Sequence, residues 1–143
     1  MAKPVSTLIG LILLVVGVVG FIPNTHNLLG AHLSPAHNAV HIVSGLLALY
    51  FGIKGTPGQA KAFALIFGIV YAALGVVGYL MGKPGEVTLA SMRGQSDEHL
   101  FPVIKGTLEL GTTDHYIHIA VGVLFLIAAI ATRISSAPRT QTA

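Results

Sequence analysis

Two short polar motifs combine histidine with a second polar residue type at helical spacing. Their six polar residues are His37, Asn38, His41, Asp114, His115 and His118. Residues four apart on a helix share a face, so His37 lies beside His41, and Asp114 lies beside His118. Each motif begins a long apolar run, and Gly45 and Gly122 follow the last histidines by four residues. These six residues form the candidate site.

The interpretation that we favour for this polar cluster is structural. Polar groups at the mouth of a membrane helix need partners whether or not they perform chemistry. We therefore expect His41 and His118 to face the interior of a helical bundle, with Asp114 or Asn38 within hydrogen-bond reach of at least one of them. On this interpretation the protein is not an enzyme and carries no cofactor.

The second interpretation is a metal or haem site. The spacing of His37 and His41 suits zinc or copper, and Asp114 or His118 could supply a third ligand. The sequence argues against a metalloprotease, because Asn38 occupies the position at which His-Glu-x-x-His carries its general base. Haem between His41 and His118 is geometrically harder, because close glycine packing leaves no gap for a porphyrin. The sequence alone does not assign any residue as a metal ligand.

A third interpretation is a proton or ligand site, because histidine titrates at about pH 6.5. A transporter would need charged or broken helices near the membrane midplane, and the sequence shows no such path. The remaining histidines, His26, His32 and His99, are each isolated in the sequence. We expect them to lie on exposed surface.

The composition indicates a membrane protein. Charged residues make up 9% of the 143 residues and hydrophobic residues 53%, with a mean hydropathy of +0.79, whereas soluble domains have about 25% charged residues. No cysteine is present, which excludes disulfides and iron–sulfur clusters. The basic pI near 9.5 needs no nucleic-acid partner. The expected partners are the lipid bilayer and, as candidates, a second copy or another membrane protein.

Four apolar runs predict an all-α, four-span bundle within a single domain of residues 1–134. Each run reaches the roughly 17–25 residues that span a bilayer, and none alternates apolar and polar residues as a barrel strand would. The predicted helices are residues 5–22, 36–53, 62–81 and 115–132. A long loop, 82–113, connects the last two, and 101–104 with 107–110 predict a short hairpin in it. Residues 135–143 are predicted to be a disordered tail.

The sequence contains an internal repeat. Residues 14–21 match 72–79 at an offset of 58, and 38–45 match 115–122 at an offset of 77. We therefore expect two repeated helical hairpins of the same direction. The matched segments carry the small residues that let membrane helices approach closely, namely Gly17, Gly20, Gly45, Gly75, Gly78 and Gly122.

The distribution of Lys and Arg predicts the orientation. Five of them lie on the side of the termini and the 54–59 link, and three lie in the long loop. Because cytoplasmic segments are enriched in Lys and Arg, we expect cytoplasmic termini in the inner (plasma) membrane. All seven histidines and all five acidic residues then fall on the extracytoplasmic side.

The motifs resemble those of a bacterial membrane family called domain of unknown function 4383. The resemblance rests on Gly17 to Pro23, on His37, Asn38 and His41 with Gly45, and on Asp114 and His118 with Gly122. It covers about residues 5–132. His115 departs from the family pattern, which tends to have Asn after the Asp. The resemblance implies a four-span membrane protein and supplies no activity.

Overall fold

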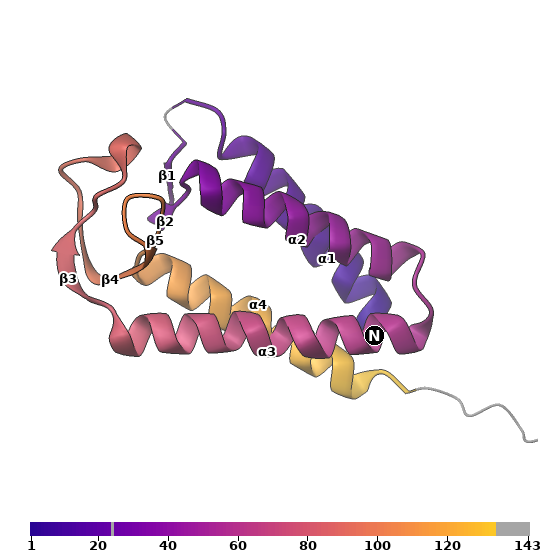
Figure 1. The fold of residues 1–143 in the computed structure, drawn as a ribbon. Coiled ribbons are helices and arrows are strands. Elements are labelled where there is room, and N and C mark those ends of the chain that lie inside the picture. Colours follow the sequence, from indigo (N-terminus) through magenta and orange to yellow (C-terminus); the bar gives the residue numbers. More distant parts are fainter. Residues whose placement is uncertain (24, 134–143) are drawn as a thin grey trace, which may run out of the picture.

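The computed structural model describes residues 1–23 and 25–133, so the predicted disordered tail lies outside the described residues. Its four long helices lie side by side, and short strands gather at one end (Figure 1). The helices are α1 (Ala2–Val19), α2 (Pro35–Ile53), α3 (Pro57–Met81) and α4 (Thr112–Ala131). The other elements are β1 (Asn27–Leu28), β2 (Ala31–His32), β3 (Lys83–Glu86), a 3-10 turn η1 (Ala90–Met92), β4 (Ser96–Ile104) and β5 (Leu108–Leu110).

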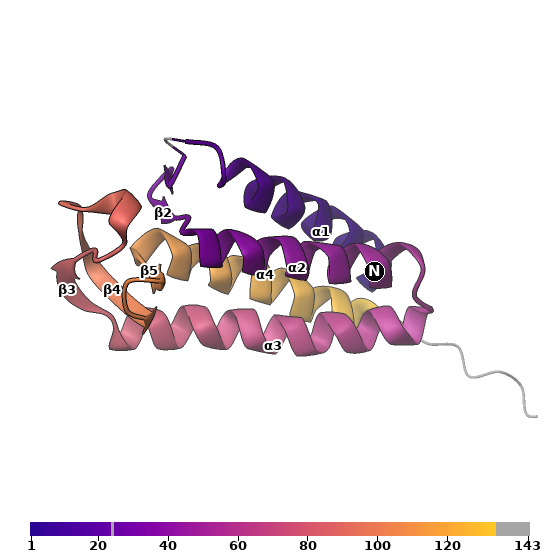
Figure 2. The same ribbon diagram turned by 45° about the horizontal axis from the view of Figure 1, so that its top comes forward.

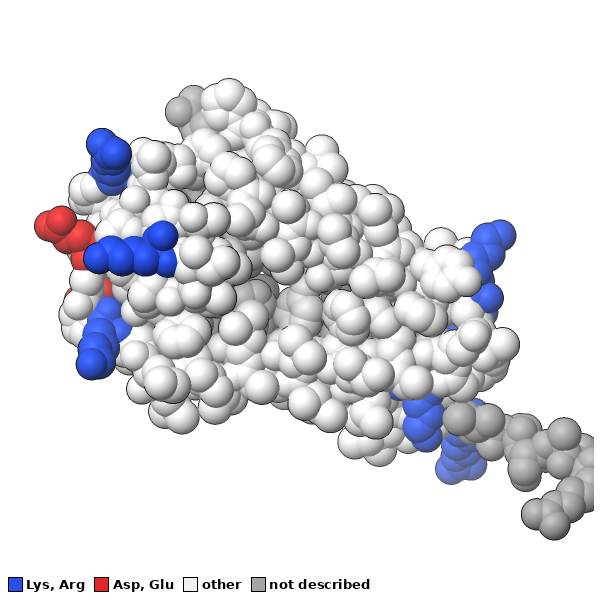
Figure 3. All heavy atoms as spheres, in the orientation of Figure 1, with Lys and Arg blue, Asp and Glu red and all other residues white. Residues whose placement is uncertain are grey.

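All four helices are long and apolar enough to cross a membrane, as the sequence predicted. They contain 18 to 25 residues, which corresponds to about 27 to 38 Å at about 1.5 Å per residue. Figure 3 shows an uncharged middle, with Lys and Arg at both ends of the bundle and Asp and Glu at one end only. This distribution is that of a membrane-spanning bundle.

The helix bounds differ from the predicted ones, and local capping explains the starts of α3 and α4. α3 begins at Pro57 rather than at residue 62, because Thr56 and Gln59 form a reciprocal capping box ahead of it. Ser34 caps α2 by accepting a hydrogen bond from the His37 backbone N–H at 3.2 Å. α4 begins at Thr112, three residues before its predicted start. α1 ends at Val19 rather than at residue 22.

The helices pack in two pairs, α1 along α2 and α3 along α4, and contacts between the pairs are far sparser (Figure 2). Glycines allow the close approach within each pair. A Cβ at Gly17 would lie 2.8 Å from the Asn38 carbonyl oxygen, and one at Gly75 would lie 2.6 Å from the His115 carbonyl oxygen. Between the pairs, Phe63 stacks on Phe51 with ring centroids 5.0 Å apart.

Strands cover the end of the bundle at which α2 and α4 begin and α3 ends (Figure 1). We call strands β1 to β5 with their connections the cap. β3, β4 and β5 form an antiparallel sheet in the order β3-β4-β5, and β1 pairs with β2. The predicted hairpin in the long loop is therefore confirmed as β4 and β5. The all-α prediction holds for the bundle and is incomplete for the cap, which contains two small sheets.

The opposite end of the bundle, which we call the basic end, carries Lys3, Lys54, Lys61 and Arg133. Here the Lys3 ammonium donates to the carbonyl oxygen of Gly55 at 2.8 Å and to that of Ile53 at 3.2 Å. Lys61 donates to the Thr132 carbonyl oxygen at 3.0 Å. The two lysine ammonium groups therefore donate hydrogen bonds to carbonyl oxygens at or just beyond the C-terminal ends of α2 and α4, where a positive charge is favoured.

We expect Gly122→Ala to lower the thermal stability of the purified protein in detergent. The added Cβ would lie 2.8 Å from the Ala72 Cα of the neighbouring helix, and overpacking of this kind costs about 1–3 kcal/mol. Gly85→Ala is the matched control, because its Cβ would meet nothing closer than 3.6 Å. Circular dichroism melting curves measure both, and equal melting temperatures for the two variants would contradict glycine-dependent packing.

Candidate functional site

The six polar residues that the sequence singled out are all buried at the capped end of the bundle. Their exposed fractions are 3% for His37, 0% for Asn38, 7% for His41, 3% for Asp114, 0% for His115 and 4% for His118. They form two overlapping sets. Four of them, His37, Asn38, Asp114 and His115, are hydrogen-bonded to cap or loop backbone. The imidazole rings of His37, His41 and His118 lie together, so His37 belongs to both sets.

The first anchor joins the two helix pairs through the backbone of His32. The Asp114 carboxylate on α4 accepts from the His32 N–H, with N–O distances of 3.1 and 3.3 Å, and from the Gly111 N–H at 2.8 Å. On α2, the Nδ1–H of His37 donates to the His32 carbonyl oxygen at 2.7 Å. His32 thus links α2 to α4. It is 3% exposed, so the prediction that it lies on exposed surface is wrong.

Asn38 and His115 are the other two anchors, and their surroundings are alike. Asn38 packs its side chain on Gly20 and donates from Nδ2 to the Leu33 carbonyl oxygen in a long hydrogen bond of 3.4 Å. His115 packs on Gly78 and donates from Nε2 to the His99 carbonyl oxygen at 2.8 Å. Each glycine leaves room for a polar side chain that holds the connection preceding its helix.

The other two isolated histidines are not freely exposed either. The ring of His99 stacks on Tyr79, with centroids 4.2 Å apart, and its Nδ1–H donates to the Tyr79 carbonyl oxygen at 3.1 Å. His26 is half-buried, and its Nδ1 lies 3.4 Å from the Leu33 carbonyl oxygen. The prediction of exposed surface failed because His99, on β4, packs against α3, and His26 lies against the backbone of Leu33 beyond the β1–β2 turn.

His37, His41 and His118 form what we call the three-imidazole cluster. The ring centroids of His37 and His41 are 4.3 Å apart, those of His37 and His118 are 5.7 Å apart, and Tyr71 lies edge-on to His118 at 5.5 Å. His41 and His118 face the bundle interior, as expected. The expected hydrogen bond from either ring to Asp114 or Asn38 is not made among the described residues, because those two side chains pair with backbone instead.

The cluster separates two cavities. The larger, of about 270 Å³, lies between α1 and α4, and the smaller, of about 80 Å³, lies between α2, α3 and the cap. All three histidines line both. Within residues 1–23 and 25–133, no group of three His, Asp or Glu side chains is arranged to hold a metal ion. The geometry therefore gives the metal interpretation no support.

The cap depends on two carboxylates that the sequence did not single out. The Asp97 carboxylate accepts from the Thr112 N–H at 3.0 Å, the Thr112 hydroxyl at 2.6 Å and the His99 N–H at 2.8 Å. Burial alone would raise the pKa of Asp97, but these hydrogen bonds and the nearby His32 ring lower that pKa below its usual value. Asp97 thereby ties β4 to the first residue of α4.

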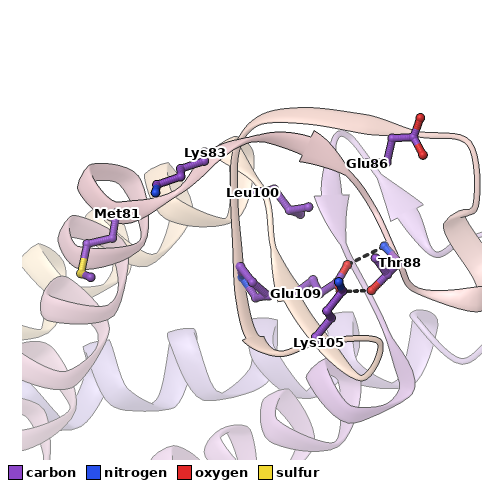
Figure 4. A pocket seen from close by; sticks show the side chains of 8 residues that line it. Met81, Lys83, Glu86, Thr88, Leu100, Lys105 and Glu109 are labelled. Atoms are coloured by element: carbon purple, nitrogen blue, oxygen red, sulfur yellow. Dashed lines mark hydrogen bonds between the residues drawn. The ribbon is translucent and has the colours of Figure 1, made fainter.

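Glu109 plays the corresponding role inside the cap (Figure 4). Its carboxylate accepts from the Thr88 N–H and the Gly106 N–H, both at 2.8 Å, and from the Thr88 hydroxyl. Burial would raise the pKa of Glu109, but these hydrogen bonds lower it below the usual value. The carboxylate lines a surface pocket of about 290 Å³ that also contains Lys83 and Lys105. Its oxygens are already engaged, which favours a structural role.

Comparison with known proteins identifies the family. The family model described as Domain of unknown function (DUF4383) matches residues 3–101. The chain belongs to this family. The DUF4383 match includes α1 to α3 and the motif of His37, Asn38 and His41, and it ends before the motif on α4. No curated protein and no solved structure matches the chain.

We expect Asp114→Ala to destabilise the protein strongly, because it leaves the buried N–H groups of His32 and Gly111 unpaired. Hydrogen bonds to a charged group contribute about 1.5–3 kcal/mol each. Glu98→Ala is the control, since it also removes one carboxylate from the cap, and Glu98 is exposed. Thermal denaturation in detergent compares the two variants. An Asp114→Ala melting temperature as high as that of Glu98→Ala would show that this anchor is not needed.

Proposed function

We propose that this protein is a non-enzymatic integral membrane protein with a structural or accessory role, in which a polar cluster fastens a cap to two helical hairpins. The observation that carries the proposal is the pairing of both backbone polar groups of His32, one by Asp114 on α4 and the other by His37 on α2. Groups engaged in this way hold structure and are not free for acid–base chemistry. The bilayer is the primary partner.

We also infer that the two hairpins are structural repeats. Contacts at corresponding positions support this inference: Gly17 approaches Asn38 and Ile42, and Gly75 approaches His115 and Ile119. The first glycine of each set lies 58 residues before the second, and the contacted residues lie 77 apart, as in the sequence repeat. Gly10 with Leu49 and Gly68 with Leu126 follow the same rule.

We propose that the basic end faces the cytoplasm and the cap faces outward across the plasma membrane. The argument is the excess of Lys and Arg on the side of the termini. All five acidic residues lie on the capped side, but acidic residues count for little in this rule. The cap, with its hydrogen-bonded strands and carboxylates, then lies in the aqueous space outside the cell.

The absence of cysteine from the chain permits a direct test of this orientation. Lys105→Cys introduces a thiol in the exposed cap, and Lys54→Cys makes the same change at the exposed basic end. In intact cells, a membrane-impermeant maleimide should label only the Lys105→Cys protein, and permeabilised cells should show both labelled. Labelling of the Lys54→Cys protein alone in intact cells would show the opposite orientation.

The competing class is a metal- or haem-binding protein that uses the polar cluster. We expect detergent-purified protein to show no Soret band and less than stoichiometric zinc, copper or iron by elemental mass spectrometry. Asp114 and His37 are engaged with backbone, and no group of three described His, Asp or Glu side chains is arranged to hold a metal ion. Protein purified from cells supplied with metal and haem precursor makes the test stringent. A stoichiometric metal that His41→Leu abolishes would favour the competing class over a structural role.

A further inference from the structure

The larger of the two cavities has the character of a ligand site. Seven apolar residues of α1 and α4 line it: Ile9, Ile12, Leu13, Val16, Ile117, Val121 and Leu124. α4 also contributes Asp114 and His118 to the lining. His37, His41 and His118 lie at one end of this apolar space. Because α1 and α4 belong to different hairpins, no glycine contact draws them together, and the space between them stays open.

The polar end of this cavity contains hydrogen-bonding groups that the protein does not satisfy. The Nδ1 atoms of His41 and His118 are buried and have no hydrogen-bond partner among the described residues. The Nδ1–H of His37 donates to the His32 carbonyl oxygen, so a neutral His37 ring presents Nε2 as an acceptor. A buried polar group without a partner is costly, and a ligand oxygen placed here would remove that cost.

Access to the cavity is from the bilayer. Residues 28–33, which include Leu28, Leu29 and Leu33, lie over its cap-side end. Ile12, Ile117 and Leu124 line it and are nevertheless 51%, 46% and 52% exposed, so the cavity opens between α1 and α4 on the apolar surface. A molecule that enters by this route is dissolved in the lipid.

We propose that this cavity binds a neutral, membrane-dissolved molecule that has an apolar body and a carbonyl or hydroxyl oxygen at one end, with the oxygen at the three-imidazole cluster. Imidazoles can donate to a carbonyl and accept from a hydroxyl, which suits both head groups. The volume of about 270 Å³ is just below the range of about 300–1,000 Å³ for small-molecule sites. It accommodates one ring or a short chain segment, while the rest of the molecule extends into lipid.

The smaller cavity on the opposite side of the cluster supports this assignment by contrast. Tyr71 stands there at the position that corresponds, in the sequence repeat, to Leu13. Its ring lies against His118 and lines the space, which is only about 80 Å³. The same three histidines therefore face a larger apolar cavity on the side of Leu13 and a smaller cavity, partly occupied by the ring of Tyr71, on the other side.

The test titrates the full chain in detergent with three probes: a decyl-substituted benzoquinone, 1-decanol and decane. Histidine side-chain NMR signals report the cluster, and equilibrium dialysis against empty micelles reports stoichiometry. We expect saturable binding of one molecule per chain for the quinone, the alcohol or both, with shifts of the His41 and His118 signals. Decane should leave these signals unchanged. The probe that binds more tightly distinguishes a carbonyl from a hydroxyl head group.

Two matched pairs of variants locate the site. Leu13→Phe and Val121→Phe add a larger side chain to the α1 wall and the α4 wall of the cavity. Each should raise the dissociation constant about tenfold or more, which corresponds to about 1.4 kcal/mol of binding free energy. Leu11→Phe and Val123→Phe make the same changes on the same helices at positions that do not line the cavity and are 52% and 43% exposed. These controls should bind as the parent protein does.

His118→Leu separates the polar contact from the space. It should weaken binding of the oxygen-bearing probes by a similar factor while the protein still folds. Several results would overturn the proposal: equal partitioning of the probes into protein and empty micelles, equal binding of decane, or equal binding by the wall variants and their controls. None of these results bears on the proposed orientation or on the anchoring role of Asp114.

Discussion

The capped end of the bundle depends on the pairing of the His32 backbone by side chains from two different helices. A chain segment buried against apolar helices must have its N–H and carbonyl groups hydrogen-bonded. In the short β1–β2 turn, the N–H and carbonyl oxygen of His32 take side chains of the helices as their partners. Asp114 supplies the acceptor from α4, and His37 supplies the donor from α2. The turn becomes a bridge because its two polar groups find partners on opposite hairpins.

Close packing within the hairpins has a consequence for the interface between them. Glycine contacts bring α1 against α2 and α3 against α4 along their length. The rows of small residues on these helices therefore face the partner within the pair and not the other pair. Between the pairs, larger side chains such as Phe51 on α2 and Phe63 on α3 meet with ring centroids 5.0 Å apart. Beyond these rings, toward the cap, the helices leave space, and both cavities beside the histidines lie there. The cavities therefore follow from how glycine is distributed.

The sequence predicted what local composition controls. Span number and the inward faces of His41 and His118 follow from apolar runs and helical periodicity, and both are present in the structure. The burial of His32 and the roles of Asp97 and Glu109 were missed, because their partners are set by the fold of the cap. Asp97 pairs with Thr112, 15 residues away, and Glu109 with Thr88, 21 residues away. No helical or strand period connects such positions.

The division of labour within the polar cluster follows from which polar atoms meet backbone. Asp114 accepts hydrogen bonds from two N–H groups that converge on its carboxyl group. Asn38 and His115 donate to carbonyl oxygens of Leu33 and His99, the connections that precede their helices. His41 and His118 lie one helical turn deeper than His37 and Asp114, and their Nδ1 atoms have no hydrogen-bond partner among the described residues. The depth of one helical turn thus separates the residues that hold the cap from those that are left free to bind something else.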